Sequence, residues 1–93
     1  MYNKEEVMYM RKEEIWSVPI SRVRAFFRAQ PDVSEAAADC YLCRSCRITL
    51  AELPPRGEGI WAAARVQVCM EGDEADVQPI HRRFFHQFLS AGG

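Results

Sequence analysis

Apolar side chains recur at helical spacing in the segment between residues 17 and 30. A Ser-Val-Pro start at 17–19 supplies a capping residue and a proline, which the first turn of a helix tolerates. The residue before Pro31 is disfavoured in a helix, so the helix should end near residue 30. The pattern predicts an amphipathic helix whose apolar side carries Ile20, Val23, Phe26 and Phe27.

A second helical stripe lies near the end of the chain. The acidic run at 71–76 precedes it, and acidic side chains at a helix start interact favourably with the helix dipole. The pattern predicts a closing helix with an apolar stripe formed by Val77, Ile80, Phe84 and Phe88 and widened by Phe85 and Leu89.

The middle of the chain alternates with the period of a β-strand. Residues 46–51 form one such run, and residues 60–70 form another after the Pro-Pro-Arg-Gly-Glu-Gly loop at 54–59. In both runs the more apolar residues have even numbers. The pattern predicts an antiparallel hairpin that pairs even residues with even residues, because a slip by one would turn one apolar set outward.

Two other segments leave their structure open. Asn3 and Glu6 have the spacing of a capping box, which favours a helix to about Glu14, whereas the apolar run at 7–10 would also serve as a short strand. Residues 34–38 suggest a short helical turn. A strand before Ser17 would give the order β-α-β-β-α.

These elements predict a single α+β domain over residues 1–93. Its antiparallel hairpin has two strands, or three if residues 5–16 are extended, and two or three amphipathic helices cover it. The expected core comprises Ile20, Val23, Phe27, Ile48, Leu50, Val66, Val68, Ile80, Phe84 and Phe88.

Composition narrows the class of protein. The chain has 93 residues, of which 48% are hydrophobic and 27% charged, with a net charge of −1, a balance typical of a folded globular domain. No apolar run reaches the ~20 residues of a membrane span, and the start lacks the apolar stretch of a secretion signal. We therefore expect a cytoplasmic protein without a membrane partner, in which cysteines are free thiols or metal ligands.

The four cysteines suggest a metal site. Three have the local spacing of thiolate clusters, so a fourth could complete a tetrathiolate site for zinc or an iron–sulfur cluster, with Cys40, Cys43, Cys46 and Cys69 as ligands. If the first strand extended back through residue 43, Cys43 and Cys69 would instead be cross-strand neighbours, within reach of a disulfide or redox pair. Packed free thiols and no cofactor are the simpler interpretation.

The odd-numbered face of the hairpin suggests a partner surface. Small residues surround one large aromatic side chain there, and the proposed contact residues are Trp61, Thr49, Ala51, Ala63 and Arg65. The alternative is that the N-terminal segment covers this face.

Other classes of function have weaker support. Nucleic-acid binding would need a basic stripe, for which the candidates are Arg22, Arg24, Arg28, Arg44 and Arg47 with Tyr41 for stacking, but the sequence pI of about 6.1 is against it. His81 and His86 are five residues apart on the last helix and would not face one metal ion. No catalytic constellation is recognisable, so the sequence predicts a non-enzymatic protein-interaction or adaptor module, with a protein partner or a second copy as ligand.

Overall fold

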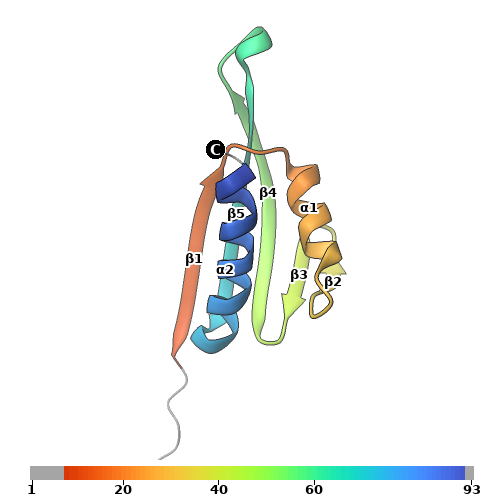
Figure 1. Ribbon diagram of the computed structural model, residues 1–93, viewed down its shortest axis with the longest axis vertical. Coiled ribbons are helices and arrows are strands. Elements are labelled where there is room, and N and C mark those ends of the chain that lie inside the picture. Colours follow the sequence, from red (N-terminus) through yellow and green to blue (C-terminus); the bar gives the residue numbers. More distant parts are fainter. Residues whose placement is uncertain (1–7, 92–93) are drawn as a thin grey trace, which may run out of the picture.

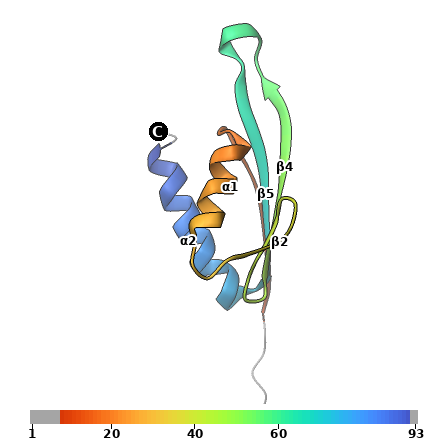
Figure 2. The same cartoon turned by 90° about the vertical axis from the view of Figure 1, so that its right-hand side faces the viewer.

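One five-stranded antiparallel sheet carries both helices on the same face (Figures 1 and 2). The computed structural model describes residues 8–91, without the side chains of residues 90 and 91. The strand order is β1-β5-β4-β3-β2. In chain order the elements are β1 Tyr9–Trp16, α1 Ile20–Ala29, β2 Ser34–Ala37, β3 Cys40–Cys43, β4 Cys46–Arg56, a 3-10 turn Gly59–Trp61, β5 Ala63–Asp73 and α2 Glu74–Ala91. Within the described part, neither helix combines the length and apolar character needed to cross a membrane.

The predicted fold class is wrong in the size of its sheet. A hairpin of two or three strands under the helices does not fit, because five strands pair in the structure and two helices pack on them. The order of elements is β-α-β-β-β-β-α. The sheet has two strands more than the larger of the two predicted sheets, which had three strands with residues 5–16 extended.

The first missed element is the N-terminal strand β1. Of the two alternatives for this segment the strand is correct from Tyr9 onward, and the Asn3–Glu6 capping box lies outside the described residues. Four charged residues in succession, Arg11 to Glu14, hide the strand period in the sequence. Pairing with β5 supplies the missing constraint, and every second side chain of β1 is half-buried beneath α2.

Two tight turns create the other unexpected strands, β2 and β3. The expected helical turn at 34–38 is wrong, because this segment is the edge strand β2. Asp39 and Arg44 adopt positive φ angles of 56° and 55° and turn the chain between β2, β3 and β4. Neither turn contains glycine or proline, the usual sequence markers of such turns.

The predicted pairing of the central hairpin is confirmed. Even residues pair with even residues, as in Ile48 with Met70 and Leu50 with Val68. Strand β5 begins three residues later than expected and extends to Asp73. The even-numbered side chains therefore face the helices, and the odd-numbered ones lie on the opposite face of β4 and β5.

The core lies between the sheet and the two helices. All ten residues expected there are buried, and Val18, Tyr41, Cys43, Cys46, Met70 and Val77 join them. The ring of Phe84 stacks on Phe27 at 5.5 Å between centroids and meets Trp16 edge-on at 5.3 Å. These contacts join both helices and β1 into one apolar cluster, which also confirms the two amphipathic helices.

A bidentate ion pair connects α1 to the turn between β2 and β3. Arg24 Nε and Nη2 donate to the two carboxylate oxygens of Asp39 at 2.7 and 3.0 Å. These hydrogen bonds lower the pKa of Asp39 below its ordinary value. At pH values above about 4, the ordinary pKa of the Asp39 carboxyl in the unfolded chain, the contact stabilises the folded state. This stabilisation is lost as the pH falls through the lower pKa that Asp39 has in the folded protein.

We predict that Asp39→Asn lowers the free energy of unfolding at pH 7 but has a smaller effect in acid. Asparagine tolerates the positive φ angle, so the variant removes the charge and keeps the turn. Urea unfolding at several pH values should show the difference from the unmodified protein shrinking below about pH 4. Arg24→Gln should lose the same pH-dependent component. A difference that stays constant down to pH 2 would contradict this role.

Candidate functional site: the β4–β5 arm

The distal half of the β4–β5 hairpin extends beyond the rest of the sheet (Figures 1 and 2). Strand β1 pairs with β5 only as far as Val66, and β3 pairs with β4 only as far as Thr49. Residues 53–65, here called the arm, therefore have no strand beside them except each other. None of them belongs to the hydrophobic core.

Two large apolar side chains occupy the tip of the arm. Ile60 and Trp61 lie in the 3-10 turn and are 88% and 81% exposed. Both were expected within the second strand, and Ile60 was expected on its core-facing side. The error arises because alternating residues continue in the sequence through a segment that lies past the end of the body.

The backbone of the tip is held by specific local geometry. Gly57 has a φ of +91°, and a Cβ atom there would lie 2.8 Å from the carbonyl oxygen of Trp61. The amide of Trp61 donates to Glu58 O at 3.0 Å. Gly57 therefore permits a close turn that directs the two apolar side chains outward, and the sequence signal for it is the Gly-Glu-Gly at 57–59.

The stem of the arm contains a β-bulge and a side-chain hydrogen bond between its two strands. The pairing of β4 with β5 shifts between Leu53 and Arg56, around two prolines that cannot donate to the ladder. Arg65 Nε donates to the carbonyl oxygen of Pro54 at 3.1 Å across the stem. The bulge and this hydrogen bond fix the direction in which the arm leaves the sheet.

The predicted partner surface is divided by the structure. Thr49 and Ala51 lie on the sheet face opposite the helices, Ala63 and Arg65 lie in the arm, and Trp61 is at its tip. The N-terminal segment does not cover this face in the described structure, because its residues 9–16 extend the sheet sideways as β1. The face is bare in Figure 2, where both helices lie on the other side.

The four cysteines are distributed over both faces of the sheet. Cys43 and Cys46 pair across a two-residue turn and are buried in the core. Cys40 and Cys69 flank Thr49 on the opposite face, one on each neighbouring strand. All four are free thiols, and no group of three metal-ligating side chains occurs among residues 8–91. Cys43 and Cys69, expected as cross-strand neighbours, lie on opposite faces with β4 between their strands.

Burial makes the core thiols weak nucleophiles. Burial is the main cause that raises the pKa of Cys46 to about 12, and the Cys43 thiol and the Asp76 carboxylate add to it. Burial also raises the pKa of Cys43, helped by Asp32, to which its sulfur donates at 3.6 Å. Thiolates are the forms that attack electrophiles, so both groups are poor nucleophiles at neutral pH.

The basic residues do not form one stripe. Arg24 and Arg28 pair with Asp39 and Glu35, and Arg22 lies over the ring of Phe88 at 5.8 Å. Arg44 and Arg47 lie elsewhere, around the β3–β4 turn. Tyr41, considered for base stacking, is fully buried, and its ring packs against Phe27 in a tilted arrangement.

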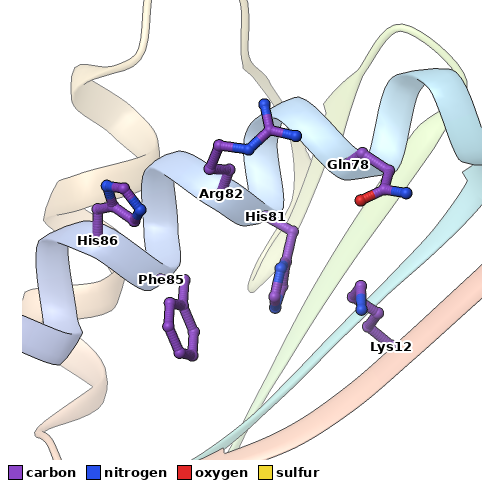
Figure 3. A pocket seen from close by; sticks show the side chains of 6 residues that line it. All are labelled: Lys12, Gln78, His81, Arg82, Phe85 and His86. Atoms are coloured by element: carbon purple, nitrogen blue, oxygen red, sulfur yellow. The ribbon is translucent and has the colours of Figure 1, made fainter.

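A shallow hollow of about 190 Å³ lies between α2 and β1 (Figure 3). His81 and Phe85 point from α2 toward Lys12 on β1, and Gln78, Arg82 and His86 complete the lining. His81 Nε2 lies 2.9 Å from Glu14 Oε2, so this nitrogen already has a hydrogen-bond partner on β1. The two histidines do not share one site for a metal ion among the described residues.

We predict that limited alkylation with iodoacetamide at pH 8 modifies Cys40 ahead of Cys43 and Cys46. Cys40 is half-buried, whereas the other two are enclosed and mostly protonated at this pH. Peptide mass spectrometry would follow each site, and alkylation in denaturant provides the control in which all sites react. Modification of Cys46 at the rate of Cys40 in the native protein would contradict the burial described above.

We predict that Trp61 carries most of the tryptophan emission that iodide quenches. Trp16 is half-buried against Phe84 and Phe85, whereas Trp61 is exposed at the tip. Trp61→Phe should remove most of the quenchable fraction, and Trp16→Phe should retain it. An unchanged quenchable fraction in Trp61→Phe would show that the tip is covered in solution.

The arm therefore stands out as the candidate site through this chain's own geometry. It combines an exposed apolar tip with a stem whose direction is fixed by local contacts. No protein-family model, curated protein or solved structure matches the chain.

Proposed function

We propose that the chain is a non-enzymatic protein-interaction module that docks through the tip of the arm. The observation that carries the proposal is the nearly complete exposure of Ile60 and Trp61 at the end of a hairpin that the rest of the domain does not cover. Adjacent exposed apolar side chains of this size are typical of contact surfaces.

The energetics favour a binding role for the tip. Full burial of an isoleucine side chain against a partner contributes roughly 1.5–3 kcal/mol, and tryptophan is enriched among residues that dominate interface energies. The free energy of burying these two side chains does not contribute to folding, since both lie outside the core of the domain.

The arm also has the form of a pre-organised ligand. The turn at Gly57, the bulge and the Arg65–Pro54 hydrogen bond favour the closed conformation of the tip over other conformations, which reduces the conformational entropy lost on docking. The charged side chains of Arg56 and Glu58 precede the apolar pair. A polar rim around an apolar anchor fits a partner with an apolar cleft bordered by both signs of charge.

We predict that Ile60→Ser combined with Trp61→Ser removes partner binding without unfolding the domain. Exposed positions away from the core change stability by less than about 0.5 kcal/mol. Affinity capture from the source cells, followed by reconstitution with each purified binder, would compare this variant with the unmodified chain. Leu89→Ser is the matched control, because it removes an exposed apolar side chain from α2.

Binders that bind the unmodified chain and Leu89→Ser but not the arm variant would support the proposal. Reconstituted binding that is equal for all three proteins would contradict it. Urea unfolding of each variant shows that the domain has remained folded.

A further inference from the structure

Strand β1 leaves its outer edge unpaired in the described structure. It has eight residues in regular register with β5, contains no proline or bulge, and lies at the edge of the sheet outside α2 (Figure 1). Edge strands of this length are templates for pairing with another chain unless charges, prolines or bulges prevent it, and β1 carries four charges, Arg11 to Glu14, which a partner strand has to match.

The direction of the backbone groups along this edge is fixed by the ladder with β5. The amide of Glu74 donates to Met8 O at 2.7 Å, which continues the register in which Tyr9 faces Asp73. Hydrogen-bonded residues alternate along an antiparallel pair, so the even residues of β1 bond to β5. The N–H and C=O groups of Tyr9, Arg11, Glu13 and Ile15 consequently point outward.

The side chains along this edge match those of the same strand read in the opposite direction. Around Lys12, Arg11 mirrors Glu13, and Tyr9 mirrors Ile15. Tyr9 and Ile15 are 67% and 57% exposed, although the ring of Tyr9, whose hydroxyl donates to Glu71, and the side chain of Ile15 are large and apolar. All four lie on the sheet face that the helices leave bare, because odd positions of β1 pair with odd positions of β5.

We propose that two copies of this chain pair through β1 in antiparallel orientation, with a twofold axis perpendicular to the sheet at Lys12. Arg11 of each copy then lies opposite Glu13 of the other, and Tyr9 opposite Ile15. Each of these pairs exchanges backbone hydrogen bonds between the outward-pointing groups. The interface is isologous, as in most homodimers.

Exposure selects this register among the neighbouring ones, since every register, including the proposed one with Lys12, places one like-charged pair on the axis. A register one step to either side would place Glu13 against Glu13, or Arg11 against Arg11, on the axis, where like charges directly opposite are destabilising. One of those registers also pairs Tyr9 with Glu13, and the other pairs Ile15 with Arg11. Only the proposed register covers both exposed apolar residues with apolar partners.

Glu13 has capacity for the additional contact, whereas Arg11 already pairs with Glu71 at 3.2 Å and shares its guanidinium between the two carboxylates. Glu13 uses Oε2 to accept from Gln67 at 2.9 Å and from Arg11 at 3.5 Å, and its Oε1 has no hydrogen bond to a described residue. The two Lys12 side chains meet across the axis on the helix side, where Glu14 of the second copy is the diagonal neighbour. Lys12 forms no ion pair within residues 8–91. The Glu14 carboxylate already contacts His81 and Trp16, so its charge offsets the repulsion only in part.

The proposed dimer determines where the arms lie. Pairing through β1 extends the two sheets into one, with all helices on one face. Because the strands of the two copies run in opposite directions, the two arms project from opposite ends. The interface uses no residue of the arm, so this inference is independent of the proposed function.

A charge-exchange experiment tests the pairing. Arg11→Glu and Glu13→Arg should each weaken self-association, measured by sedimentation, by about tenfold or more, because both symmetric contacts become repulsive. A mixture of the two variants should restore association. In the mixed dimer the glutamate introduced at position 11 faces the arginine introduced at position 13, and the native Glu13 of one variant faces the native Arg11 of the other. Restoration in the mixture also shows that both variants are folded.

Oxidative cross-linking tests the register. Lys12→Cys should form a covalent dimer readily, whereas Arg11→Cys and Glu13→Cys should cross-link poorly, with the unmodified chain as the control for native thiols. A monomer at all concentrations, or no association in the mixture, would overturn the inference. Preferred cross-linking at Arg11→Cys or Glu13→Cys would overturn the register.

The arm variant separates the two proposals. Ile60→Ser with Trp61→Ser should leave the dimer intact. Loss of the dimer in that variant would place the self-contact at the arm, which overturns the β1 inference and leaves the arm as a docking element.

Discussion

The pairing of β4 with β5 in even-to-even register is the constraint on which the remaining structure depends. It places Ile48, Leu50, Val66 and Val68 on one face, where both helices cover them. A shift by one residue would expose this set and bury the polar one. The Phe27–Phe84 stack joins the two helices over this face, and β1 and β3 join the flanks of the same hairpin. Phe27 also contacts Tyr41 of β3, and Phe84 contacts Trp16 of β1.

Because the neighbouring strands end before the β4–β5 hairpin does, the hairpin has two different parts. Up to Leu50 and from Val66 onward, its strands are supported by neighbouring strands and by the core. Beyond that boundary the arm is held only by its own pairing and turn contacts, and a two-stranded hairpin alone is marginally stable in water. Ile60 and Trp61 lie exposed at the end of this arm and outside the core, and for this reason we propose that they contact a partner.

The sequence predicted those parts of the fold in which periodicity and burial agree. The two helical stripes and the hairpin parity were correct because the same residues satisfy the local period and the core. Strand β1 was ambiguous because Arg11 to Glu14 do not alternate, and only the pairing with β5 and the cover from α2 make this segment a strand. The turns at Asp39 and Arg44 have positive φ angles but contain no glycine that would mark them in the sequence. The boundaries of β2 and β3 could therefore not be recognised from the sequence.

The candidate site was predicted only in part, for a related reason. Trp61 was identified as a contact residue, but Ile60 was placed on the core-facing side of the expected strand because alternation continues past the point where β1 and the helices end. The spacing of Cys40, Cys43 and Cys46 resembled a thiolate cluster. In the structure this spacing spans strand β3, a two-residue turn and the start of β4. Cys43 and Cys46 therefore face the core, and Cys40 faces the opposite side of the sheet.

The division of the hairpin into a supported body and an unsupported arm is tested most directly by native-state amide hydrogen exchange. Ladder amides of residues 66–70 should exchange only on global unfolding, whereas those of residues 63–65 should exchange through local opening with a much lower free energy. Equal protection of both segments in the isolated protein would contradict the account, because the arm would then be part of the cooperative core.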